Sequence, residues 1–281
     1  MKKIVSFIIA LAILSLSLLA FASCGTNPKI VAIPNDGTNE ARALRLLESL
    51  GLIKLKEGLD TTATVLDIVE NPYKIEFKEV EAAQLPSILG DVGYAVINSN
   101  YAIAAGITPF VTEGTDVSYP NIIAVKAGNE NTDKTKALVA AINSKAVADY
   151  INSTYKGAIV CDLENTGDGY DASVNYDALA GTTIKIAASP TPHADILKIA
   201  KEILAKKNIT LNIGEFTDYI VPNNVVESGE YDANYFQHVP YLDDFNEENG
   251  THIVSAAAIH VEPMGLYGGQ QQDLNALNLA K

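Results

Sequence analysis

Two stretches of this chain repeat one order of predicted elements: strand, helix, strand, helix, strand. The first runs from a strand at 29–34 to a strand at 93–98, and the second from a strand at 183–188 to a strand at 231–236. Strands separated by helices pair in parallel and carry the helices on the faces of their sheet. A chain of 281 residues is long enough for two such units. The sequence therefore predicts an α/β protein of two lobes, each a mostly parallel sheet flanked by helices.

The third strand of each unit ends in polar or aromatic residues. In the first unit Asn98 and Asn100 follow the strand; in the second the exit carries Tyr235, Phe236 and His238. Ligands of open α/β sheets bind beyond the carboxyl ends of the strands, and a cleft between lobes is a common small-molecule site. The alternatives are ordinary turn chemistry for the asparagines and an aromatic corner of the core for the rings.

Arg42 lies in the first turn of the first predicted helix, just after the loop residue Asn39. A cation is unfavourable at the positive end of a helix, and an anion in front of that end reverses the effect. The guanidinium fork suits a carboxylate, because it can bind both oxygens. We therefore expect Arg42 to hold a ligand carboxylate, with Asn39 beside it. An exposed arginine, or one paired with Asp36, is the alternative.

The rings of the second unit, with His193 at the start of a helix, suit a flat-walled apolar pocket. A thioether fits such walls, since sulfur–aromatic contacts contribute about 0.3–1.5 kcal/mol. The sequence contains no HExxH motif, P-loop or nucleophile elbow, so we expect neither an enzyme nor a bound cofactor. We expect no metal, although a site built from His193, His238 and His260 is the alternative.

The N-terminus predicts a targeting segment. Two lysines precede an apolar run, which ends at 21–24 in FASC, a sequence similar to a bacterial lipobox. We expect Cys24 to be lipidated and to hold the protein on the outer face of a membrane; an uncleaved anchor is the alternative. The net charge of −14 argues against nucleic acid as a partner.

Several long segments resemble the NlpA/MetQ family of methionine-binding lipoproteins. They are TPHADIL (191–197), EFTDYIVPNN (215–224), DANYFQHVPYLDDFN (232–246), HVEPMGLY (260–267), AIPNDGTNEARALRLLESLGLIKLK (32–56), EAAQLP (81–86), AVINSNYA (95–102), NIIAVK (121–126) and TYKGAIV (154–160). Their order differs from that of the family, where TPHADIL comes early, HVEPMGLY precedes AIPND, and TYKGAIV ends the chain. The resemblance implies a circular permutation, with 161–181 as the new linker; a misassembled gene is the alternative.

The resemblance also implies a type II periplasmic-binding-protein fold with a hinge. The expected division is a signal peptide at 1–23, a lipidated tether at 24–28, one lobe at 29–100, a crossover at 101–120, the other lobe at 121–265 and a tail at 266–281. Because the permutation would cut the second crossover near 265–272, we expect a looser hinge than in unpermuted relatives.

The family's ligand residues match motifs of this chain. The resemblance implies that Arg42 holds the ligand's carboxylate, that Asn98 holds its amino or carboxylate group, and that Tyr235, Phe236 and His238 line the side-chain pocket with His193 near the rim. It implies a substrate-binding lipoprotein that delivers methionine, or a related amino acid or dipeptide, to the permease of an ABC importer. A sensing lipoprotein and a metal-binding solute receptor are the alternatives.

Overall fold

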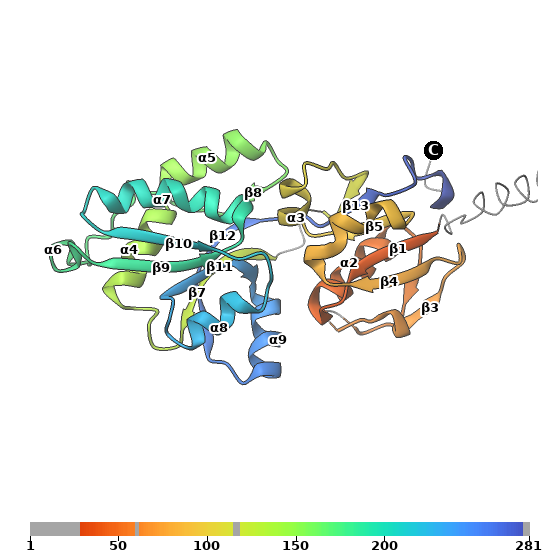
Figure 1. Ribbon diagram of the computed structural model, residues 1–281, viewed down its shortest axis with the longest axis horizontal. Coiled ribbons are helices and arrows are strands. Elements are labelled where there is room, and N and C mark those ends of the chain that lie inside the picture. The colour runs from red at the N-terminus through yellow and green to blue at the C-terminus, as the bar shows by residue number, and fades with distance from the viewer. Residues whose placement is uncertain (1–28, 60–61, 115–118, 278–281) are drawn as a thin grey trace, which may run out of the picture.

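The computed structural model describes residues 29–59, 62–114 and 119–277 and shows two α/β lobes lying side by side (Figure 1). The predicted signal peptide and Cys24 lie outside the described residues. Within those residues, no helix combines the length and the apolar character that crossing a membrane requires. The prediction of two lobes of sheets flanked by helices is confirmed.

The first lobe contains a five-stranded sheet of order β4-β1-β5-β13-β6. Its strands are β1 (Ile30–Pro34), β4 (Glu76–Val80), β5 (Tyr94–Ile97), β6 (Val111–Thr112) and β13 (Gly265–Gly268). The helices are α2 (Gly37–Ser49), the 3-10 helix η2 (Ala82–Asp91) and α3 (Ser99–Ala104), with a ribbon of β2 (Lys54–Leu55) and β3 (Ile68–Glu70) and short 3-10 turns at Val65–Asp67 and Asn275–Leu277. Helix α2 begins where the Asp36 side chain accepts a hydrogen bond from Asn39 N–H, and its leucines pack against β1.

The second lobe contains a six-stranded sheet of order β10-β9-β11-β7-β12-β8. Its strands are β7 (Pro120–Lys126), β8 (Val160–Cys161), β9 (Thr183–Ala188), β10 (Thr210–Glu215), β11 (Ala233–His238) and β12 (Ile253–Val261). The helices are α4 (Asp133–Ile142), α5 (Lys145–Tyr155), α6 (Tyr176–Leu179), the π-helical turn η3 (Pro190–Ala194), α7 (Asp195–Ala205), α8 (Val221–Glu227) and α9 (Val239–Asn249).

Both sheets are mixed, because each adds antiparallel strands to a parallel core. β1 pairs in parallel with β4 and β5, and β9 with β10 and β11, as the repeated pattern predicts. Antiparallel pairing joins β13 to β5 and β6, and β7 to β11 and β12. The strands β12 and β13 and helix α9 were not predicted from the sequence.

The chain passes between the lobes twice, after β6 and again after β12. The expectation that the C-terminal residues lie outside the sheets is therefore wrong. Residues 266–281 were expected to form a tail, with the second crossover cut. Instead Gly265 pairs with Ile97 and Leu266 with Val96, and Leu266 and Leu277 are fully buried in the first lobe. Hydrogen bonds and apolar burial hold this segment in the sheet. The second connection between the lobes therefore has both ends held in a sheet. The looser hinge was expected because this connection would be cut, and that reason no longer applies.

Two further expectations differ in detail. The helical stretch expected at 133–152 is broken at Asn143, and α5 starts anew with Ser144 capping Val147 N–H. The segment expected as a surface linker at 161–181 is partly packed on the lobe, since Val174 is buried and the Tyr170 hydroxyl donates to the Ile203 carbonyl at 3.0 Å.

Candidate functional site

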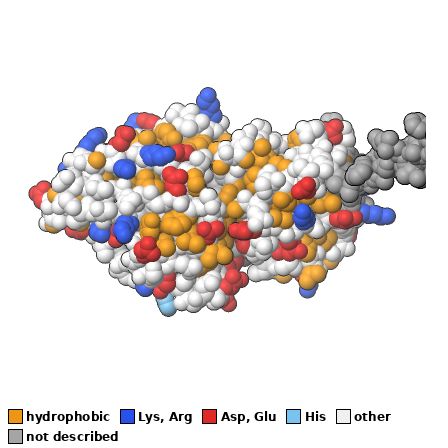
Figure 2. Space-filling model, viewed as in Figure 1, with side chains coloured by type: hydrophobic (Ala, Val, Ile, Leu, Met, Phe, Trp, Pro, Cys, Tyr) orange, Lys and Arg blue, Asp and Glu red, His pale blue; other side chains and the backbone are white. Residues whose placement is uncertain are grey.

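A small cavity lies between the lobes and gathers most of the predicted ligand residues. It is lined by Asn39, Arg42, Asn98, Ser99, Asn100, Asn121, Tyr219, Phe236, Gln237, His238, Tyr241 and Glu262. Only about 20 Å³ of it is open to the centre of a water-sized sphere, which is room for about one water. Beside it a crevice of about 520 Å³ shares Tyr219 and Tyr241. Figure 2 shows acidic side chains next to the boundary between the lobes.

Arg42, from the first turns of α2, joins the cavity to both inter-lobe connections. Its Nε donates to the two carboxylate oxygens of Glu113 at 2.9 and 3.0 Å, and Nη2 donates to Glu113 as well. Nη2 also donates to the backbone carbonyl of Glu262 at 2.6 Å. Glu113 follows β6 and Glu262 follows β12, so one guanidinium holds the start of each connection. Its carbon also lies 4.7 Å from the centre of the Tyr119 ring.

A chain of amides leads from the helix start into the cavity. Asn98 Nδ2 donates to Asn39 Oδ1 at 2.8 Å, and Asn39 Nδ2 donates to Asp36 Oδ1 at 2.7 Å. Asn98 Oδ1 is fully buried and has no hydrogen-bond partner among the described residues. A buried acceptor without a donor costs about 1–3 kcal/mol. The cavity wall therefore presents an acceptor that a ligand N–H group would satisfy.

Aromatic rings close the other side of the cavity. The ring centres of Tyr219 and Phe236 are 5.6 Å apart, and those of Phe236 and Tyr241 are 6.0 Å apart. The Tyr219 hydroxyl donates to Asn100 Oδ1 at 2.8 Å, which links the two lobes. His238 caps α9 by accepting from Tyr241 N–H at 3.3 Å. Burial and the nearby Arg42 charge lower the pKa of His238 well below its usual value, so this ring is neutral at pH 7.

Tyr235 and His193, two of the predicted pocket residues, do not line the cavity. Side chains alternate along a strand, so Tyr235 points to the face opposite Phe236 and is completely buried in the core of the second lobe. His193 lies next to it, with ring centres 4.6 Å apart. A bulge in the pairing of β11 with β7 after Tyr235 places both Gln237 and His238 at the cavity.

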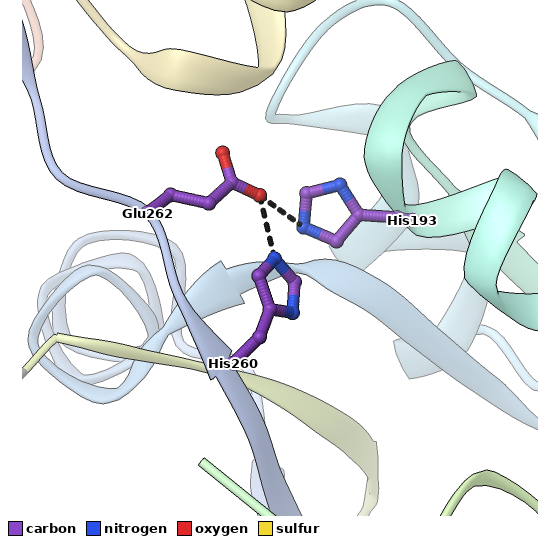
Figure 3. Close-up of side chains that lie close together, drawn as sticks. All are labelled: His193, His260 and Glu262. Carbon is purple, nitrogen blue, oxygen red and sulfur yellow. Dashed lines mark hydrogen bonds and ion pairs between the residues drawn. The ribbon is translucent and has the colours of Figure 1, made fainter. Parts of the chain in front are cut away.

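Behind the cavity, His193 and His260 both point toward the Glu262 carboxylate (Figure 3). His260 Nε2 lies 2.7 Å and His193 Nε2 3.3 Å from Glu262 Oε1, and His193 Nε2 also lies 2.8 Å from Asn121 Oδ1. Burial lowers the pKa of His193 to about 3. Although burial opposes it, the nearby His193, His260 and Arg42 keep the pKa of Glu262 below its usual value, so the carboxylate is ionised at pH 7.

The same three side chains are the metal-ligand candidates of the described residues. The ligand atoms of His193, His260 and Glu262 lie within 4.8 Å of one another. His238, the third histidine of the alternative considered from the sequence, is not among them. Each of the three atoms already has a hydrogen-bond partner, and His260 Nδ1 is bonded to the Tyr235 hydroxyl. The three candidate ligand atoms are therefore already engaged in hydrogen bonds, whereas His193 Nδ1 is buried without a partner among the described residues.

Several cavity residues were missed by reasoning from the sequence. Tyr219, Tyr241 and Glu262 stand in segments that resemble the family, but nothing in their local pattern distinguishes them from structural residues. Glu113, on a stretch without clear periodicity, was not considered at all. The resulting site offers a guanidinium, amide groups, a buried carboxylate and ring faces, which suits an amino acid better than any reaction.

Comparison with known proteins identifies the family of the chain. The sequence profile described as NlpA lipoprotein matches residues 25–162 and 184–280. The D-methionine-binding lipoprotein MetQ of Yersinia pestis is 42% identical over 136 residues, which are 46% of this chain and 50% of that protein. Membrane lipoprotein TpN32 of Treponema pallidum is 42% identical over 135 residues, 47% of this chain and 50% of that protein. The chain thus spans about half the length of the curated relatives it matches.

Solved structures match over similar shares. A nutrient-binding protein from Burkholderia cenocepacia bound to methionine is 44% identical, with a TM-score of 0.45 over 49% of this chain and 61% of that chain. Lipoprotein Tp32 from Treponema pallidum is 41% identical, with a TM-score of 0.44 over 46% and 55%. The profile match is interrupted at 163–183, near the expected linker, and the permuted order stays a prediction. Since the profile covers well over half of the residues, this chain belongs to the NlpA lipoprotein family.

Proposed function

We propose that this chain is a substrate-binding lipoprotein that takes up methionine, or a closely related amino acid or dipeptide, between its lobes and catalyses no reaction. The observation that carries the proposal is the pairing, in one inter-lobe cavity, of the buried Arg42 with the unpartnered acceptor Asn98 Oδ1. An amino acid carries the two groups that these side chains would bind.

The ligand carboxylate belongs at Arg42. Among the described residues Nη1 of this guanidinium has no hydrogen-bond partner, whereas Nε and Nη2 are occupied by Glu113 and the Glu262 carbonyl. The ligand ammonium belongs at Asn98 Oδ1 and the Glu262 carboxylate, both of which are on the cavity wall. Charge-assisted hydrogen bonds at both ends would orient the molecule.

The ligand side chain belongs against the rings of Tyr219, Phe236 and Tyr241. These rings offer faces and edges to a flexible apolar chain, and a thioether gains an additional sulfur–aromatic contact. Methionine is the substrate that the name of the MetQ relatives gives, and it is bound in the Burkholderia cenocepacia structure. Both enantiomers and other apolar amino acids have the groups this site recognises.

Entry of such a ligand requires the lobes to part, because the cavity holds about one water. Three hydrogen bonds across the cleft would break. They run from Tyr219 to Asn100 at 2.8 Å, from the Tyr101 hydroxyl to the Thr217 carbonyl at 2.9 Å, and from the Thr38 hydroxyl to the Asp244 carboxylate. Binding then favours the closed form. We propose that this form docks on the permease of an ABC importer, with lipidated Cys24 as anchor on the extracytoplasmic face of a membrane. Delivery to a receptor, as a sensor, is the second candidate.

Calorimetric titration of unfolded and refolded protein tests the binding proposal. The probes are L-methionine, D-methionine, leucine, lysine and glutamate. We expect micromolar or tighter binding of at least one methionine enantiomer and none of glutamate. Phe236→Ala should weaken methionine binding by roughly tenfold to a hundredfold. The matched control Phe216→Ala removes a ring of the same lobe that packs on Tyr231, 5.7 Å between centres, away from the cavity. Equal affinities of these two variants would reject the site.

A further inference from the structure

Glu113 covers one side of the Arg42 guanidinium. Its carboxylate accepts hydrogen bonds from Nε and Nη2 of Arg42 and from the backbone N–H of Met264, the last at 2.7 Å. The side chains of Arg42 and Glu113 are only 4% and 7% exposed. Buried oppositely charged groups in this geometry compensate each other closely. Glu113 therefore fixes the orientation of Arg42 and also neutralises its charge.

The cavity offers a ligand no excess of positive charge. Glu262 is a second buried carboxylate on the same wall, and its contact with Arg42 is made by its backbone carbonyl. His193 and His238 are neutral at pH 7, since burial lowers the pKa of both rings. The wall thus holds one guanidinium and two carboxylates, of which Glu113 is paired with Arg42 and Glu262 is hydrogen-bonded to His260 at 2.7 Å, so it carries no net positive charge. A ligand that brought only a carboxylate would add a negative charge that no cation of the wall compensates, in surroundings where like charges repel strongly.

We propose, resting on the binding function above, that Glu113 is a specificity-determining residue. By neutralising Arg42 it makes the cleft accept carboxylates only from ligands that bring an ammonium group as well, and so excludes simple carboxylic acids. Arg42 alone would receive any small carboxylate. With Glu113 beside it, the favourable ligand is a zwitterion, whose ammonium compensates Glu262 while its carboxylate is bound at the free edge of Arg42. This selection depends on charge and not on the ligand side chain.

The test compares matched pairs of ligands that differ only in the ammonium group. The probes are methionine with 4-(methylsulfanyl)butanoate, and leucine with 4-methylpentanoate, titrated calorimetrically at pH 7. The proteins are the mature chain, Glu113→Gln and Glu113→Asp. Glu113→Gln removes the charge while keeping an acceptor for Met264 N–H. We expect the wild-type protein to bind the amino acids at least about a hundredfold more tightly than the matched acids. Glu113→Gln should reduce that ratio by about tenfold or more, and Glu113→Asp should largely preserve it.

The outcomes separate this inference from the proposed function. If the wild-type protein binds neither amino acid, the binding function fails and the inference fails with it. If it binds an amino acid but binds the matched acid within about threefold, the function stands and the inference is overturned. The same holds if Glu113→Gln binds both ligands with an unchanged ratio. Should Glu113→Gln not fold, the wild-type ratio and its retention in Glu113→Asp decide the question, since a ratio lost in Glu113→Asp would contradict a role of the charge.

Discussion

Removing Arg42 should destabilise the protein even in the absence of ligand. Arg42→Ala leaves the Glu113 carboxylate buried, with Met264 N–H as its remaining donor among the described residues and with no cation at its side. Removing one partner of a buried ion pair costs about 3–5 kcal/mol. The loss of the hydrogen bond from Nη2 to the Glu262 carbonyl adds about 1 kcal/mol. We therefore expect the free energy of unfolding to fall by about 5 kcal/mol.

Urea unfolding followed by circular dichroism measures this loss, and the same helix supplies the control. Arg45 lies one turn further along α2 and forms an ion pair with Glu48 at 2.7 Å, but its side chain is 36% exposed. Arg45→Ala should cost less than about 1 kcal/mol, because exposed ion pairs contribute little. The double variant Arg42→Met with Glu113→Leu should recover part of the lost stability, since it leaves no unpaired charge. If Arg42→Ala is no more costly than Arg45→Ala, the buried-pair argument is refuted.

The remaining predictions concern the cavity and the histidines. Asn98→Leu should weaken amino-acid binding by roughly tenfold to a hundredfold, measured by calorimetry, because it removes the acceptor left for the ammonium. The folded-state pKa of His193 is about 3 against an ordinary 6.5, so the folded protein binds fewer protons in that range. Stability should therefore fall as the pH drops below 6.5, by about 1.4 kcal/mol per pH unit from this residue, and His193→Gln should show a shallower slope in urea titrations between pH 7 and 5. Treatment with EDTA should leave the melting temperature and the methionine affinity unchanged, because the Nε2 atoms of His193 and His260 are already hydrogen-bonded to Asn121 and Glu262; a drop in either would show a structural metal. Tyr219→Phe removes the bond to Asn100 across the cleft and should increase the radius of gyration of ligand-free protein in small-angle scattering.

Local patterns in the sequence were enough for the repeated architecture. The strand at Thr183–Ala188 has the predicted bounds, and helix α2 follows from the spacing of Leu44 and Leu47, although it begins at Gly37, within the segment expected to be a loop. Each of these features depends on residues a few positions apart. The residues predicted at the strand ends, Asn98, Phe236 and His238, line the cavity. Arg42, predicted near the start of the first helix, lines it as well.

The tertiary structure decided what each residue does there. The partner of Arg42 is Glu113, 71 positions away, and the guanidinium also meets a carbonyl 220 positions away. The strand β13 enters the first sheet beside β5. Along β11, the alternation of side chains turns Tyr235 away from the cavity, and a bulge places Gln237 at it. Periodicity records which face of an element is apolar, but not which distant segment covers that face. The amino-acid order alone therefore determined the two lobes and most of the polar and aromatic groups that meet in the cavity between them. Only packing between remote segments decided how those groups are paired. The physical reason is burial, because an unpaired charge or acceptor has a large free-energy cost only where water is excluded.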